Sequence, residues 1–266
     1  MKYKNIILIT LLLIALTIGV GSVSASQDNA TVDELTVNED MDVESSVIDE
    51  VVAEDSDNYL SSNGSLIILN GGTFEDIQKA VDESSDEDVI ELHGTFESTG
   101  MSISVYKNLT FNGVNGTILD GKNLSGFFNS DQHLMLNGLT FINSSNEVNY
   151  HSFILNNSEI VNCNFINCNP FSAHNSCNFI NCSFYDSSII LGAGNVFNCS
   201  FYDSEGINGA GDVINCSFIN CWSAFYGVIY GANDILNCKF INNSVESGSG
   251  VSNVGSVINC LFKEYA

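Results

Sequence analysis

Val196–Phe201 reads Val-Phe-Asn-Cys-Ser-Phe and represents a motif, apolar-apolar-Asn-Cys-x-Phe, that recurs through the second half of the chain. The six copies are Ile160–Phe165, Phe179–Phe184, Val196–Phe201, Val213–Phe218, Ile235–Phe240 and Val257–Phe262. Their cysteines are 19, 17, 17, 22 and 22 residues apart. A fixed motif at an irregular period of about 20 residues is typical of stacked solenoid turns joined by loops of different length.

The residues of the motif favour short strands, because they are β-branched, aromatic or small. The chain has a single proline, Pro170, so its turns depend on Asn, Asp, Gly and Ser. The period is too short for the helix pairs of α-solenoids. We therefore predict an all-β fold, a single-stranded right-handed parallel β-helix (solenoid) with an N-terminal capping helix.

The asparagine of the motif marks a bend. Cys and Phe lie two residues apart and should both point inward, but the two apolar residues before the Asn cannot both face inward on a straight strand. Asn tolerates left-handed backbone angles. We predict a ladder of stacked asparagines joined by side-chain hydrogen bonds, formed by Asn162, Asn181, Asn198, Asn215, Asn237 and Asn259. Asn181, Asn198 and Asn215 also match the glycosylation pattern Asn-x-Ser/Thr, but as members of the ladder they should be inaccessible.

The phenylalanines of the motif should form an internal column. Phe141 and Phe111 follow similar Leu-Thr pairs and extend this column upstream in our prediction. The 30 residues between them then require an inserted loop or strand. The count predicts roughly eight coils, spaced ~4.8 Å apart.

Nine cysteines in an exported chain would suggest disulfides. Inward side chains on stacked coils run parallel, with Cβ atoms ~4.8 Å apart, whereas a disulfide requires about 3.8 Å and converging vectors. We predict that Cys163, Cys182, Cys199, Cys216, Cys238 and Cys260 form a reduced, buried column, with Cys168, Cys177 and Cys221 outside it.

The N-terminal quarter of the chain carries signals for export. In residues 1–25, Lys2 and Lys4 precede the apolar run Ile6–Val20, and a small-residue cleavage site ends at Ala25, which predicts a signal peptide. An uncleaved anchor is the alternative, although the run is short for a membrane span. Residues 26–60 are predicted to be a disordered acidic linker, since Gln27–Asn58 has twelve Asp or Glu and no Lys or Arg.

Residues 61–121 are predicted to form an N-terminal cap and first coil, and residues 122–266 the remaining coils. Thr73 and Asp76 have the spacing of a capping box that starts a helix ending near Ser84. Its apolar face would comprise Phe74, Ile77, Ala80 and Val81. A solenoid end needs such a cover, because it exposes apolar side chains and backbone groups.

Gly72–Asp82, Asp88–Phe96 and Leu109–Gly121 together resemble the N-terminal cap and first coil of pectin-lyase-fold proteins. The Asn-Cys-x-Phe coils are similar to the repeats of adhesin-like surface proteins of methanogenic archaea. The resemblance implies a cell-surface or secreted protein that binds surface glycans or proteins of host or neighbouring cells. It also raises an alternative, a polysaccharide lyase or glycoside hydrolase, but lyases of this fold use a catalytic arginine and this chain has none.

The charge of the chain limits the kinds of molecule that it could bind. The formal net charge is −25, and all seven basic residues are lysines. Nucleic acid would be repelled, and phosphate groups would find no guanidinium. No stretch after the signal peptide is apolar enough to span a membrane, so no stable span is expected after cleavage.

Asp186 and Asp203 lie one repeat apart and should stack with their carboxylates within several ångströms of each other. A shared proton or bound Ca²⁺ would relieve their repulsion, which makes them the candidate ligands of a weak Ca²⁺ site. Alternatively, they are solvated turn residues that replace Asn167, Asn220 and Asn242 in one column. No other cofactor is predicted.

Aromatic residues cluster in the middle coils, at Tyr185, Tyr202, Trp222 and Tyr226. Aromatic side chains on a flat β-face stack on sugars and enrich interaction surfaces, although core packing is an equal alternative. No pattern of Ser, His, Asp or Cys indicates a catalytic site. We therefore predict a non-catalytic, adhesin-like binding or structural protein, located outside the cell, with these four aromatics as candidate ligand-binding residues.

Overall fold

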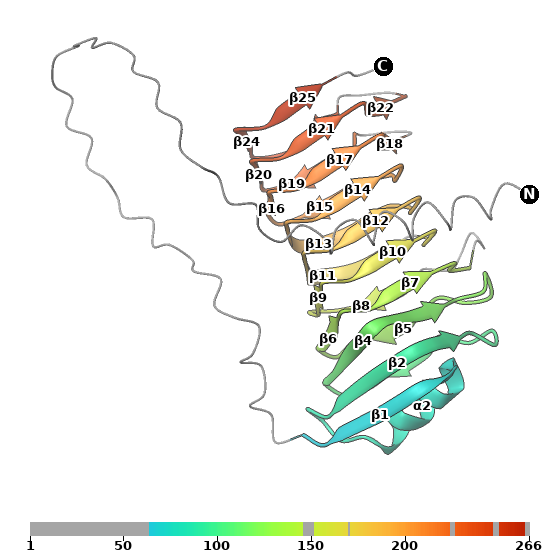
Figure 1. Ribbon diagram of the computed structural model, residues 1–266. Helices are drawn as coiled ribbons and strands as arrows, with labels where there is room; N and C mark the ends of the chain where they lie inside the picture. Colours follow the sequence, from blue (N-terminus) through green and yellow to red (C-terminus); the bar gives the residue numbers. More distant parts are fainter. Residues whose placement is uncertain (1–63, 146–151, 170, 224–226, 247–249, 264–266) are drawn as a thin grey trace, which may run out of the picture. The chain divides into compact units, whose positions relative to one another are not determined.

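The computed structural model describes residues 64–145, 152–169, 171–223, 227–246 and 250–263 (Figure 1). By internal contacts the chain divides into Met1–Glu54 and Asp55–Ala266. The predicted signal peptide and the whole of the predicted acidic linker lie outside the described residues. The second unit is a parallel β-helix with an N-terminal capping helix, so the predicted fold class is confirmed.

The coils contribute strands to three faces, and the strand pairings of the described residues are parallel and join successive coils. The first face contains β1 (Leu66–Thr73), β2 (Val89–Glu97), β4 (Leu109–Asp120), β6 (Leu134–Asn137), β9 (Glu159–Val161), β11 (Phe171–Ile180), β13 (Ile190–Phe197), β16 (Val213–Ile214), β20 (Asp234–Leu236) and β24 (Ser256–Ile258).

The second face follows the first after a corner. It contains the later parts of β1, β2 and β4, then β7 (Thr140–Ile142), β10 (Asn164–Ile166), β12 (Ser183–Tyr185), β14 (Ser200–Tyr202), β17 (Ser217–Ile219), β21 (Lys239–Ile241) and β25 (Leu261–Lys263). The third face contains β3 (Ile103–Val105), β5 (Phe128–Ser130), β8 (Phe153–Leu155), the starts of β11 and β13, β15 (Ile207–Ala210), β19 (Ile229–Ala232) and β23 (Val251–Ser252). Between the second and third faces, β18 (Trp222–Ser223) pairs with β22 (Ser244–Val245).

The core consists of columns of inward-pointing apolar side chains that run along the faces from coil to coil. On the second face, Phe184, Phe201 and Phe218 pair in register, and successive ring centroids are 4.6 Å apart. These three side chains are buried, and burying a phenylalanine contributes roughly 1.5–3 kcal/mol. Since Val196 also pairs with Val213, the predicted register between the coils that carry Cys199 and Cys216 is confirmed.

The prediction for Phe111 is wrong. Phe111 pairs with Leu136 and so belongs to the first-face column, whereas Phe141 pairs with Leu119 in the second-face column. The reason is that β4 continues from the first face onto the second, and both halves carry an apolar-x-apolar pattern. Leu119 and Phe141 are 22 residues apart, an ordinary coil length, so no inserted loop or strand is required.

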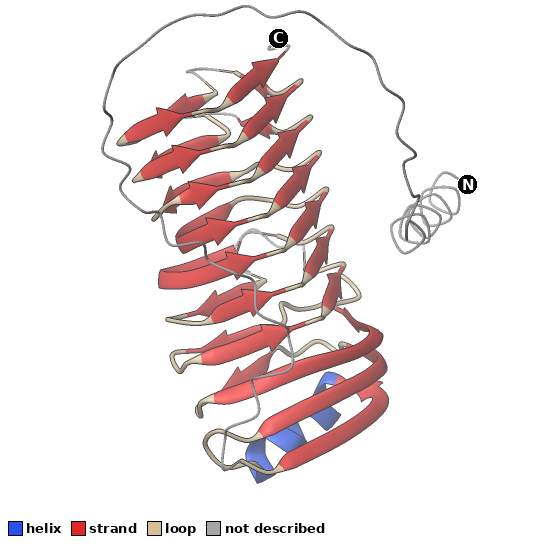
Figure 2. Ribbon diagram, turned by 60° about the vertical axis from the view of Figure 1, so that its left-hand side comes forward, coloured by secondary structure: helices blue, strands red, loops and turns tan. Residues whose placement is uncertain are grey.

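Helix α2 (Phe74–Glu83) lies at the end of the stack, beside the first coil (Figure 2). The capping box is present: the Asp76 amide donates to Thr73 Oγ1, and the Thr73 amide donates to Asp76 Oδ2. The Thr73 amide and the Thr73 hydroxyl both donate to the Asp76 carboxylate, and these two hydrogen bonds lower the pKa of Asp76. At the other end of the helix, Lys107 Nζ donates to the carbonyls of Val81, Asp82 and Ser84. The predicted apolar face of the helix is buried.

The first corner of each coil lies between the first and second faces. Asn198 has φ 53° there, and all six predicted asparagines share this left-handed geometry. Asn181 Nδ2 donates to Asn162 Oδ1 at 3.2 Å, and Asn198 Nδ2 donates to Asn181 Oδ1 at 3.3 Å. The ladder begins earlier than predicted, because Asn162 Nδ2 donates to Asn137 Oδ1.

The predicted inaccessibility of these asparagines is wrong: all six side chains are exposed. Of the two apolar residues that precede each Asn, the second points outward. Examples are Phe197, which is half-buried, and Ile258, which is exposed. The Asn therefore lies outside as well, and only the Cys that follows points inward. The ladder is a surface feature.

The six motif cysteines form one internal column, as predicted, with Cys260 half-buried and the rest buried. All nine cysteines of the chain are free thiols. The backbone amide of Cys182 donates to Cys199 Sγ at 3.4 Å, and that of Cys199 donates to Cys216 Sγ at 3.4 Å. Each Sγ in turn donates to backbone carbonyls. The thiols thus satisfy backbone groups that the corner removes from the sheet ladders.

Candidate functional site

A second corner follows the first by five residues in each regular coil. Its left-handed residues are Asn143, Asn167, Asp186, Asp203, Asn220 and Asn242, with φ between 46° and 53°. The next residue again points inward, is small and polar, and is buried; this column comprises Ser144, Cys168, Ser187, Ser204, Cys221 and Asn243. Cys168 and Cys221, predicted to lie outside the main thiol column, therefore have equivalent places at the second corner.

The internal column of the second corner also accepts backbone hydrogen bonds. The Ser187 amide donates to Ser204 Oγ at 3.1 Å, and the Cys221 amide donates to Asn243 Oδ1 at 2.7 Å. Sequence reasoning missed this column because its members differ in type. The constant spacing of five residues from the first-corner Asn was the available signal.

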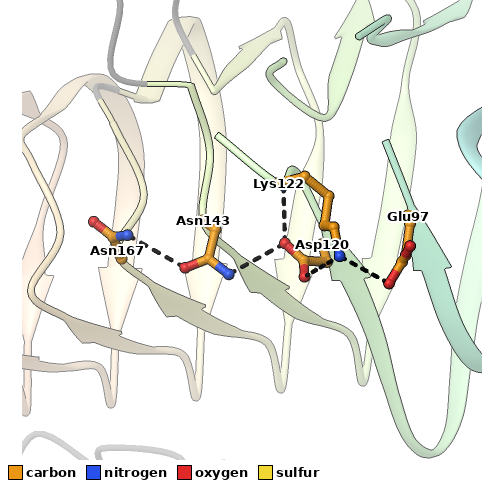
Figure 3. Close-up of polar contacts among 5 residues, drawn as sticks. All are labelled: Glu97, Asp120, Lys122, Asn143 and Asn167. Carbon is orange, nitrogen blue, oxygen red and sulfur yellow. Dashed lines mark hydrogen bonds and ion pairs between the residues drawn. The ribbon is translucent and has the colours of Figure 1, made fainter. Parts of the chain in front are cut away.

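The outer ladder of the second corner begins with a carboxylate (Figure 3). Asn143 Nδ2 donates to Asp120 Oδ1 at 3.1 Å, and Asn167 Nδ2 donates to Asn143 Oδ1 at 3.3 Å. Lys122 lies beside Asp120 and donates to Glu97 Oε1 at 3.0 Å, a hydrogen bond that raises the pKa of Lys122. Asp120 is thus paired with an amide on one side and lies near a cation on the other.

At Asp186 and Asp203, aspartate takes the place of asparagine in the outer ladder. The Asp186 amide donates to the carbonyl of Tyr202, which places the two aspartates on consecutive coils, as predicted. Both are exposed. In every ladder bond of the asparagines, the amide of one coil donates to the oxygen of the preceding coil. A carboxylate has no such donor, so this donor pattern is interrupted at two successive positions.

The residues immediately before these aspartates also depart from the pattern. The outward position that ends each second-face strand is Ile142, Ile166, Ile219 or Ile241 in four coils, but Tyr185 or Tyr202 in the two coils that carry aspartate. The tyrosine rings stack in parallel, with centroids 5.0 Å apart and an interplanar angle of 6°. Both side chains are half-buried, and burial raises the pKa of Tyr185.

Trp222 lies on the coil after Asp203 and is 45% exposed. Its backbone amide donates to the carbonyl of Ser204, just as that of Glu205 donates to Ser187, so Trp222 and Glu205 hold equivalent positions on consecutive coils. Glu205 accepts a hydrogen bond from Ser188 Oγ. Tyr226, the fourth predicted aromatic, lies outside the described residues. We name Tyr185, Asp186, Tyr202, Asp203, Glu205 and Trp222 the Tyr-Asp surface.

The interior offers no comparable site in the part of the chain that the structure describes. The cavity beside Phe165 and Phe184 has a volume of about 10 Å³, too small for a sugar ring. No three His, Cys, Asp or Glu side chains of the described residues lie close enough together to hold a metal ion. Likewise, none of the described helices is long and apolar enough to cross a membrane.

Comparisons with known proteins identify no family. No protein family model matches the sequence, and no curated protein matches it. Among solved structures, the chain is similar to a pectate lyase from Bacillus sp. N165 crystallised in complex with trigalacturonate. The identity is 12%, the match covers 77% of this chain and 83% of that chain, and the TM-score is 0.35. Similarity at this level indicates nothing about what this chain binds or catalyses.

Proposed function

We propose that the chain is an exported, cell-surface or extracellular β-helix protein that binds a partner and does not catalyse a reaction. The Tyr-Asp surface is its binding site in this proposal. Export is supported by the charged, apolar and small-residue order of residues 1–25. The partners in this proposal are glycans or proteins on host or neighbouring cells, of the adhesin-like kind.

One observation carries the proposal: two consecutive coils replace the pair Ile-Asn with Tyr-Asp. The replacement gives up ladder hydrogen bonds and sets two like charges on adjacent coils. Natural proteins break local structural rules mainly at functional sites. Aromatic side chains are also enriched at interaction surfaces relative to the rest of a protein surface.

The enzymatic alternative is less consistent with these side chains. A glycoside hydrolase needs one carboxyl group kept protonated by apolar surroundings, opposite a second carboxylate, with the sugar between them. Asp186 and Asp203 instead occupy the same exposed corner position on neighbouring coils. Their environments do not differ in the way that separate acid and base roles require.

The test is a binding and turnover screen of the secreted protein. Wild type is applied to a glycan array and to extracellular proteins, and reducing-sugar release is measured in parallel. We expect binding without sugar release, and a loss of about tenfold or more in affinity in Tyr185→Ser/Tyr202→Ser. The matched control is Ile219→Ser/Ile241→Ser, which changes the same stripe in two other coils. Sugar release abolished by Asp203→Asn would instead establish an enzyme.

A further inference from the structure

The Tyr-Asp surface carries negative charge without a cation nearby in the sequence. No Lys or Arg occurs between Lys122 and Lys239. Asp186 and Asp203 are exposed, and within the described residues neither they nor Glu205 takes part in an ion pair. The carboxylate of Glu205 accepts a hydrogen bond from the neutral Ser188 hydroxyl. The surface is therefore complementary in charge to a cation.

The geometry of the tyrosine pair disfavours sugar stacking. The two rings face each other at 5.0 Å, so each covers one face of the other. On the sides of the tyrosine pair that face away from each other, Ile166 pairs with Tyr185 and Ile219 pairs with Tyr202 in the same outward column. Sugars stack on an open aromatic face, whereas this column leaves mainly ring edges and hydroxyl groups at the surface.

The same geometry suits a basic side chain. An ammonium or guanidinium group accepts no hydrogen bonds but donates several, and it meets the carboxylates of Asp186 and Asp203 on consecutive coils. The exposed indole of Trp222 provides an aromatic face for a second cation, with the Glu205 position one coil away. Apolar stems of Lys or Arg would cover the half-buried tyrosines.

We infer that the partner of the Tyr-Asp surface is a protein segment rich in Lys or Arg. This inference rests on the proposed function and specifies its partner. The segment lies across the coils of β12, β14 and β18, with one cation between Asp186 and Asp203 and another at Trp222. An acidic polysaccharide is excluded as partner by the like charge of this surface.

The experiment uses the full secreted chain and a labelled decalysine peptide, with decaglutamate and decaserine as probe controls, at near-physiological salt. Asp186→Asn/Asp203→Asn is compared with Asp40→Asn/Asp42→Asn, which changes the net charge equally but in the acidic linker. We expect decalysine affinity to fall about tenfold in the first variant and less than twofold in the second. Trp222→Ala should lower it several-fold without changing the net charge.

The outcomes separate the inference from the proposed function. Equal losses in both double variants would show attraction to net charge alone and overturn the inference. If decalysine binding is insensitive to the surface variants but a neutral glycan is lost in Tyr185→Ser/Tyr202→Ser, the inference falls and the proposed function stands. If binding of every partner is unchanged in both the aspartate variants and the tyrosine variants, the inference and the proposed function are both wrong. Thermal unfolding of each variant confirms folding, which Asp→Asn should preserve because asparagine occupies the same corner in four other coils.

Discussion

The two corners of each coil solve one structural problem with different residues. Both use a left-handed residue followed by a small, buried, polar side chain that accepts a backbone amide from the neighbouring coil. In the six motif copies, the first corner is always Asn then Cys. The second corner uses Asn or Asp, then Ser, Cys or Asn.

This difference shows at which corner positions the fold tolerates substitution. The physical requirements of a corner are satisfied by several residue pairs, as the second corner demonstrates, so uniformity at the first corner is not required by backbone geometry alone. The second corner varies at both its inward and its outward position, and the outward change to Asp186 and Asp203 is the one that removes ladder donors. The first corner is a repeated structural element, and the second carries the candidate site.

The largest expected effect is alkaline unfolding, because the first corner concentrates buried thiols. Burial raises the pKa of Cys163, at the first corner, from 9.0 to about 12. It also raises the pKa of Cys168, at the second corner, to about 12. The unfolded chain ionises first, so the contribution of the buried thiols to the free energy of unfolding should be fully present below pH 9 and be lost between pH 9 and 12. Urea unfolding measured across this range checks the prediction.

Variants with serine in place of cysteine test whether the thiols cause the alkaline unfolding. Cys163→Ser/Cys199→Ser/Cys216→Ser at the first corner should move the onset of alkaline unfolding upward more than Cys168→Ser/Cys221→Ser at the second, since more thiols with a raised pKa are removed. Stability at neutral pH serves as the reference for each variant. An onset unchanged by the three first-corner substitutions would contradict a role for the thiol column.

A moderate effect is expected from removing one internal acceptor at each corner. Cys199→Ala leaves the Cys182 amide without its acceptor, and Ser204→Ala does the same to the Ser187 amide. Each should lower the free energy of unfolding by about 1–3 kcal/mol, because a buried donor is left unsatisfied. The controls Cys199→Ser and Ser204→Cys retain an acceptor and should lose less. If alanine were as stable as wild type, the acceptor role would be disproved.

The smallest effect is expected from exchanging the outer residues of the corners. Asp203→Asn provides an amide that donates to Asp186, as Asn167 donates to Asn143, and should raise the free energy of unfolding by about 0.5–1.5 kcal/mol. Asn198→Asp removes the bond to Asn181 and should lower it by a similar amount. Urea unfolding measures both. A destabilised Asp203→Asn would mean that the aspartate has a structural role.

Several errors of sequence-based prediction have a common cause. Phe111 and Phe141 follow the same Leu-Thr pair, yet they lie in different columns, because strand pairing between coils and not local sequence decides the column. The exposure of Asn198 likewise depends on which side of the corner faces solvent. The capping helix was predictable, since capping residues and helical periodicity are local signals.

For the candidate site, the placement of Asp186 and Asp203 on consecutive coils followed from the repeat spacing alone. The parallel ring contact of Tyr185 with Tyr202, and the internal Ser187 and Ser204 beside them, did not follow. Ring orientation and hydrogen-bond direction arise between coils, so they have no signature within a single repeat.

The amino-acid sequence by itself determined the repeat, the left-handed Asn corners, the inward Cys and Phe, and the capped N-terminal end, because each depends on residues a few positions apart. Only the tertiary structure decided that Phe111 and Phe141 lie in different columns, that the Asn ladder is outside, and that two Tyr-Asp pairs form one surface with Glu205 and Trp222. The physical reason is that coil lengths vary from turn to turn, so parallel strand pairing, and not sequence distance, sets which side chains become neighbours.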